Sequence, residues 1–216
     1  MMVTRCVLIS MGWVLLLLGG CGPSGSSQAA APPTPPKQVL RKLIELRAAS
    51  KYAELSKHVV PSRAAETVQT LMAVDSFLHA NEALIDHVTR EVSPGLARVI
   101  DQSRLGQAQD VFSRGVDLLD EVISGDAAQV AFTIESQIPA RTARFRLVGG
   151  QWLLDPGDGY HAAIPAAFER MAVGLRQTLE ELRSGRMSAA QLTENPQKLI
   201  DDVRTRLTPG LSMLPE

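Results

Sequence analysis

The chain has 216 residues, and its 22 Lys+Arg nearly balance 23 Asp+Glu, which gives a formal net charge of −1. This balance lacks the basic excess by which proteins bind nucleic acid or an anionic lipid surface. The two cysteines, Cys6 and Cys21, both lie near the N-terminus. The rest of the chain therefore offers no disulfide, no cysteine metal site and no cysteine nucleophile.

Residues 1–20 have the pattern of a secretory signal peptide. Arg5 is their only charge, and residues 6–20 are apolar or small, with Ser10 the most polar. Such a core is shorter than the roughly 20 residues with which a helix spans hydrocarbon. A basic start, a short apolar core and small residues at its end are typical of a cleaved signal. Removal of residues 1–20 leaves 21 Lys+Arg against 23 Asp+Glu, a net charge of −2.

The signal ends in Leu18-Gly19-Gly20-Cys21, which resembles the lipobox of bacterial lipoproteins. The resemblance implies cleavage before Cys21, diacylglycerol on its sulfur and a third acyl chain on its amine. One acyl chain holds a protein on a bilayer reversibly, whereas two or more hold it firmly. Gly22, in place of Asp, resembles lipoproteins exported to the outer membrane of Gram-negative bacteria. We expect an envelope protein anchored to the lipid bilayer, and the alternative is an ordinary signal with an incidental cysteine.

Residues 21–36 are expected to form the lipidated cysteine and a disordered tether. The stretch GPSGSSQAAAPPTPP has no hydrophobic period and almost nothing to bury. Where it is extended, at about 3 Å per residue, it reaches roughly 40 Å from the lipid.

Helices are predicted next. Apolar residues recur at three- and four-residue steps over 37–58, and a longer helix is predicted over 63–92, with Ser62 as its N-cap. Ser93-Pro94-Gly95 ends that helix, and a short helical segment is expected at about 95–110.

Four strands are then predicted, at 116–123, 129–136, 141–148 and 151–155. Apolar and polar residues alternate along the middle two, which indicates an antiparallel meander with one buried face. Helices over about 161–184 and 188–207 follow. We expect an α+β fold in which helices cover the apolar face of the sheet, organised as one domain over 37–210.

The segment with these strands resembles the NTF2-like (cystatin-like-roof) lipoproteins of the bacterial envelope. The matching residues are Gly125-Asp126, Ala128, Val130 and Gly149-Gly150-Gln151-Trp152. The resemblance implies an NTF2-like part over about 37–160, with 161–207 as a helical C-terminal extension. That family hosts many functions, so the fold it implies does not name an activity.

The candidate site is a polar stripe on the second helix. Asp75, His79, Glu82 and Asp86 lie within about 60° of one another at roughly 100° per residue, beside an apolar arc. Asp75 and His79, four residues apart, have a spacing that suits a divalent metal or a base with the residue that orients it. The alternative is a solvated helix flank with weak side-chain pairs.

Other candidates lie on the strands and in the loop after them. Arg144 and Arg146 share a strand face, where they either receive an anionic ligand or pair with Glu135 of the neighbouring strand. Trp152 and Phe145 either line a pocket or belong to the core. The loop after the last strand carries acidic and aromatic residues that suit either Ca²⁺ or a plain turn: Asp155, Asp158, Tyr160 and His161.

The sequence has no phosphate-binding glycine loop, no G-x-S-x-G and no H-E-x-x-H. The hypothesis we favour is a non-catalytic binding or interaction module, without cofactor or metal, that meets a protein partner or a small ligand. The alternative is a small NTF2-like hydrolase or isomerase that uses Asp75 and His79.

Overall fold

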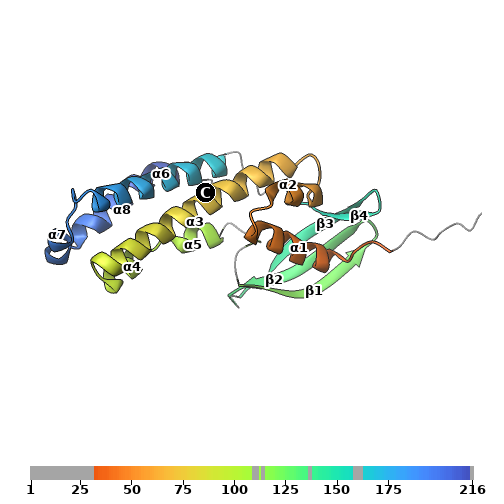
Figure 1. Cartoon of the computed structure of the whole chain (residues 1–216). Helices are drawn as coiled ribbons and strands as arrows, with labels where there is room; N and C mark the ends of the chain where they lie inside the picture. Colours follow the sequence, from red (N-terminus) through yellow and green to blue (C-terminus); the bar gives the residue numbers. More distant parts are fainter. Residues whose placement is uncertain (1–31, 109–111, 113–114, 136–137, 158–162, 215–216) are drawn as a thin grey trace, which may run out of the picture. The chain divides into compact units, whose positions relative to one another are not determined.

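A computed structural model describes residues 32–108, 112, 115–135, 138–157 and 163–214. All that follows concerns the compact unit formed by Pro33–Glu216. Its fold is α+β, as predicted, with helices before and after a four-stranded antiparallel sheet (Figure 1).

The sheet is the predicted meander. Its strands are β1 (Val116–Ser124), β2 (Ala127–Ile134), β3 (Arg141–Val148) and β4 (Gln151–Leu154), in the order β1-β2-β3-β4. The turns use residues at positive φ, which glycine adopts without strain: Gly125 (φ 59°) and the pair Gly149-Gly150 (φ 57° and 78°). Alternate residues of the inner face are buried, namely Ala128, Val130, Phe132, Ile134, Ala143, Phe145, Trp152 and Leu154.

Strand β1 contains a bulge where α1 (Pro36–Ala48) begins. Leu118 and Glu121, three residues apart, oppose Phe132 and Val130, which are only two apart. The extra residue turns Glu121 toward α1, where its carboxylate accepts the backbone N–H of Lys37. Lys37 Nζ also donates to the Leu119 carbonyl at 2.6 Å. These contacts fix the first turn of α1 against the edge of the sheet.

The predicted helix over 37–58 is interrupted. α1 ends at Ala48, and α2 (Tyr52–Leu55) continues into a 3-10 turn, η1 (Ser56–His58). Ser50 lies between them in the left-handed region, at φ 55°, which stops the helical hydrogen bonding. The chain then lies beside β4, since Val60 N–H donates to the Leu154 carbonyl at 2.9 Å. This contact covers the outer edge of β4.

The long predicted helix is α3 (Ala64–Glu91). The expected cap by Ser62 is wrong, because Arg63 occupies the N-cap position and no side chain caps the helix. The predicted segment after it is two short helices, α4 (Pro94–Ile100) and α5 (Ser103–Ala108). Ser93 caps α4 and accepts the Leu96 N–H at 3.1 Å.

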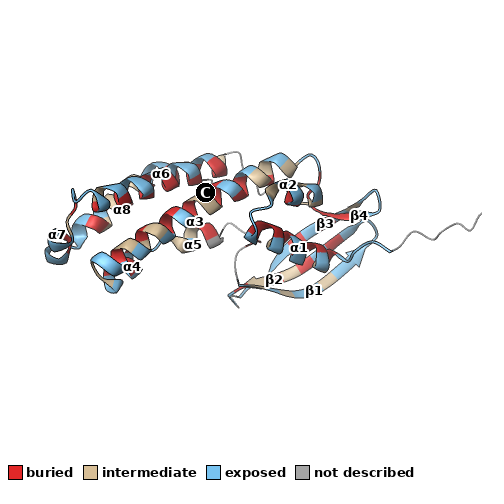
Figure 2. Cartoon of the chain, viewed as in Figure 1, coloured by how far each residue is buried: buried red, intermediate tan, exposed pale blue. Residues whose placement is uncertain are grey.

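The C-terminal helices are α6 (Ala163–Arg183), α7 (Ala189–Glu194) and α8 (Gln197–Leu211). We expected the helices before and after the sheet to cover its apolar face, but no described residue of α6 or α8 belongs to the sheet core. α6 and α8 belong to a helical core with α3 and α4, in which Phe77 and Phe168 meet edge to face at 5.3 Å. The sheet core instead takes α1, α2 and Leu71 of α3. Figure 2 shows buried positions in red on both groups of elements.

Candidate functional site

All four residues of the predicted polar stripe line one pocket of about 390 Å³. We call it the α1–α3 pocket, because residues of α1 and α3 form two of its walls and Asp101, Ser103 and Phe112 complete it. Part of the lining is apolar: Ile44 and Ala48 from α1, Leu78 and Ile85 from α3, and Phe112. Its volume lies in the range of about 300–1,000 Å³ that small-molecule sites occupy.

Asp75, one of the lining residues, is bound by two neighbouring side chains. Arg47 Nη2 of α1 lies 2.6 Å from Asp75 Oδ1, and Tyr52 Oη of α2 donates to Asp75 Oδ2 at 2.6 Å. Arg47 is only 6% exposed, so its charge is compensated within the fold by this carboxylate. Asp75 therefore ties α1 and α2 to α3, across the interruption at Ser50.

The environment of Tyr52 agrees with this role. Burial, followed by its hydrogen bond to Asp75 and the negative charge there, raises the pKa of Tyr52 to about 12. A phenol with a raised pKa holds its proton, so Tyr52 stays a donor to Asp75 well above neutral pH. The carboxylate already accepts from two side chains, which makes it a poor general base.

His79, Glu82 and Asp86 are exposed where they line the pocket. Within the described part of the chain, no hydrogen bond joins His79 to Asp75, the two residues whose spacing suits a base and the residue that orients it. No cluster of three or more His, Cys, Asp or Glu residues able to hold a metal ion occurs among the described residues either. In this stripe, the carboxylate of Asp75 is bound by side chains of the fold, and the three residues that follow are exposed to the pocket or to solvent.

A buried asparagine also lines the pocket, and this was not predicted from the sequence. Asn81 is 3% exposed, donates from Nδ2 to Asp101 Oδ1 at 2.8 Å and accepts the Gln102 N–H at 3.0 Å. Asp101 also accepts the Ser103 N–H at 2.9 Å. An amide placed inside the apolar arc of α3, with an Asp-x-Ser turn after α4, was the signal available in the sequence.

These contacts set the charge state of Asp101. Burial acts to raise the pKa of this carboxyl, but hydrogen bonds from Ser103 and Asn81, with the nearby charge of Arg104, hold it below its usual range. Asp101 is therefore an anion in the pocket across the neutral and mildly acidic range.

A second hollow, of about 550 Å³, shares Asp75 and His79 with the lining of the first. We call it the α3–α6 hollow, since Met72 and Ser76 of α3 face Arg176 and Arg183 of α6 across it. Arg176 Nη1 donates to Ser76 Oγ at 3.1 Å. The two hollows thus have opposite charged linings, acidic in the first and basic in the second.

The predicted arginine candidates lie on the outer face of the sheet. Arg144 is opposite Gln129 and Arg146 is opposite Ala127, whereas Glu135 lies beyond β2 at φ 49°. The expected pairing with Glu135 is therefore wrong. Arg146 instead binds Asp155 at 2.7 Å, between its Nη2 and a carboxylate oxygen.

Asp155 also accepts the Gly157 N–H at 3.1 Å, so this carboxylate shapes the turn that follows β4. Trp152 is 5% exposed and packs with Phe145 in the sheet core, away from both hollows. The remaining loop candidates, Asp158, Tyr160 and His161, lie outside the described residues, as does Cys21.

No protein-family model, curated protein or solved structure matches the chain. Among the described residues, none of the helices combines the length and apolar character needed to cross a membrane.

Proposed function

We propose that this chain is a lipid-anchored protein of the bacterial cell envelope, whose folded body binds a small ligand in the α1–α3 pocket without catalysing a reaction. The anchor is Cys21, by its lipobox context, and residues 21–36 are the tether between the bilayer and the body. In a Gram-negative host this places the body in the periplasm, on the outer membrane.

One observation carries the binding role: the predicted stripe lines a pocket of ligand size, and the one member of the stripe with an ion pair in the described chain, Asp75, is bound by Arg47 of the fold. A pocket with apolar walls and a few polar groups is the usual form of a small-molecule site. A hydrolase or isomerase that uses Asp75 and His79 has less support, because Asp75 accepts from Arg47 and Tyr52.

We also propose that residues 37–160 are related to NTF2-like envelope domains. The glycine-containing motif residues form turns of the meander: Gly125-Asp126 joins β1 to β2, and Gly149-Gly150 joins β3 to β4. The other motif residues lie in β2 and β4: Ala128, Val130, Gln151 and Trp152. Because any antiparallel meander needs such turns, the relation stays a prediction.

The anchor is tested by the mass of the mature N-terminus, for the wild type and Cys21→Ser. We expect a lipid-sized mass increment and membrane fractionation for the wild type, and neither for the variant. A wild-type protein without that increment would overturn the anchor and leave the pocket unaffected.

The binding role is tested by filling the pocket. N-phenyl-1-naphthylamine, a neutral dye that fluoresces in apolar sites, should brighten with the wild type. Ala48→Trp places an indole at an exposed position that lines the pocket, and we expect it to abolish that signal.

Ala49→Trp is the matched control, because Ala49 is the exposed next residue and is not among those that line the pocket. Equal signals from the two variants, or no signal from the wild type, would contradict a ligand site here.

A further inference from the structure

The charges of the α1–α3 pocket are unequal. Arg47, the only Lys or Arg among its described lining residues, is bound to Asp75. Glu82, Asp86 and Asp101 therefore give the lining an excess of negative charge. Of the nearby cations, Arg104 acts on Asp101 from outside the lining, and Arg90 bonds the backbone carbonyl of Asp86. Within the described chain, neither Glu82 nor Asp86 forms an ion pair.

The apolar part of the lining comes from both cores. Ile44 packs on the sheet core, to which Phe112 belongs, whereas Leu78 and Ile85 pack on the helical core. Hydrocarbon that packs against these side chains is removed from water, at a gain of about 0.8 kcal/mol for each CH₂ that is buried. The carboxylates of Glu82 and Asp86 stand at the exposed side of the same pocket.

We propose that the α1–α3 pocket takes a cation joined to a hydrocarbon, of the kind represented by a protonated alkylamine. The alkyl chain lies among Ile44, Leu78 and Phe112, and the ammonium group faces Glu82 and Asp86. This inference rests on the proposed function, because it names the ligand class of the same pocket. An anion on the same chain is disfavoured, since it would meet three carboxylates and one cation that is already paired.

The test compares three head groups on one chain length. Octylamine, 1-octanol and octanoate are titrated at neutral pH into the mature chain carrying Cys21→Ser, labelled at Ile, Leu and Met methyl groups. The methyl signals of Ile44 and Ile85 report the α1–α3 pocket, and those of Met72 and Leu179 report the α3–α6 hollow. We expect octylamine to shift Ile44 and Ile85 with about ten-fold higher affinity than octanol, because each exposed carboxylate contributes a factor of about two to five.

The outcomes separate this inference from the proposed function. Octanol or octanoate that shifts Ile44 and Ile85 as strongly as octylamine would overturn the cation preference and leave the binding role intact. No shift of these methyls by any of the three compounds would overturn both. Octanoate shifts confined to Met72 and Leu179 would agree with the proposal, because that hollow carries Arg176 and Arg183.

Charge variants supply the matched control. Glu82→Gln and Asp86→Asn should each lower the affinity for octylamine by about two- to five-fold and leave octanol unchanged. Glu91→Gln removes an exposed carboxylate from the same helix outside the pocket, and it should have no effect. An unchanged affinity in the first two variants, or an equal loss in the third, would overturn the proposal.

Discussion

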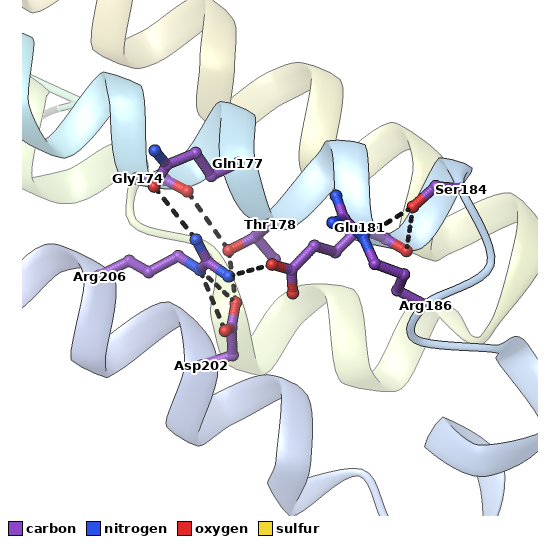
Figure 3. A network of polar contacts seen from close by, with 8 residues as sticks. All are labelled: Gly174, Gln177, Thr178, Glu181, Ser184, Arg186, Asp202 and Arg206. Atoms are coloured by element: carbon purple, nitrogen blue, oxygen red, sulfur yellow. Dashed lines mark hydrogen bonds and ion pairs between the residues drawn. The ribbon is translucent and has the colours of Figure 1, made fainter.

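Two buried threonines show that the contribution of a buried hydroxyl to stability depends on its hydrogen-bond partners. Thr178 Oγ1 of α6 donates to Asp202 Oδ2 of α8 at 2.6 Å, within the network around Arg206 (Figure 3). Thr70 of α3 is 3% exposed, yet its Oγ1 has no hydrogen-bond partner in the described structure. A buried polar atom without a partner costs about 1–3 kcal/mol, whereas a hydrogen bond to a charged group contributes about as much.

The same substitution should therefore act in opposite directions at these two sites. Thr70→Val keeps the side-chain shape and removes the unpartnered hydroxyl, and we expect it to raise the free energy of unfolding by about 1 kcal/mol. Thr178→Val should lower it by about 1–3 kcal/mol, because Asp202 loses a donor. Urea unfolding of both variants checks this pair, and a loss of stability at Thr70 comparable to that at Thr178 would contradict it.

At the scale of elements, α6 and α8 are held by close backbone contact as well as by charge. A Cβ added at Gly174 of α6 would lie 2.9 Å from the backbone oxygen of Arg206 in α8. Arg206 of α8 reaches across this junction to Glu181 of α6, with Nη2 2.7 Å from Oε1 (Figure 3). Its Nε lies 2.9 Å from Asp202 Oδ2 within α8. Its side-chain hydrogen bond to Asp202 is the main reason that the pKa of Arg206 is raised above its usual range.

Gly174→Ala should lower the free energy of unfolding by about 1–3 kcal/mol, because the two helices must separate to admit the methyl group. Gly95→Ala is the control, since a Cβ there meets only Ser93 Oγ at 3.9 Å. Removal of a helical glycine at an open position should stabilise the protein by about 0.5–1 kcal/mol. Thermal unfolding distinguishes the two, and a Gly174→Ala variant as stable as the wild type would refute the close contact.

At the scale of the whole described body, local patterns determined much of the fold. The alternation in β2 and β3 and the glycines between the strands predicted the meander, because both signals act over neighbouring residues. The interruption at Ser50 is closed by local hydrogen bonds, from Ser50 N–H to the Arg47 carbonyl and from Lys51 N–H to the Leu46 carbonyl, but no glycine marks the left-handed position. The bulge in β1 was not predictable, since it accompanies a contact of Glu121 with the distant helix α1. The division into two cores was not predictable either. An apolar stripe on α6 predicts that this face is buried, but it does not predict which element packs against it.

The candidate site was predictable to a similar degree. Helical spacing placed Asp75, His79, Glu82 and Asp86 on one face, and that face does line a pocket. The partner of Asp75 was not predictable, because Arg47 lies 28 positions earlier on another helix. That contact determines which acids can meet a ligand, since Asp75 is in an ion pair with Arg47 whereas Glu82 and Asp86 are exposed in the pocket lining.

Helix α3 belongs to both cores, through Leu71 in one and the segment from Ala73 to Val88 in the other. The α1–α3 pocket opens along this helix, with one wall supported by each core. A ligand bound there would contact residues that pack on the sheet core and residues that pack on the helical core. It would therefore raise the free energy needed to unfold either core. A bound ligand would therefore make thermal unfolding more cooperative. The transition would be narrower, and its midpoint would lie at a higher temperature, because the sheet core and the helical core would unfold together.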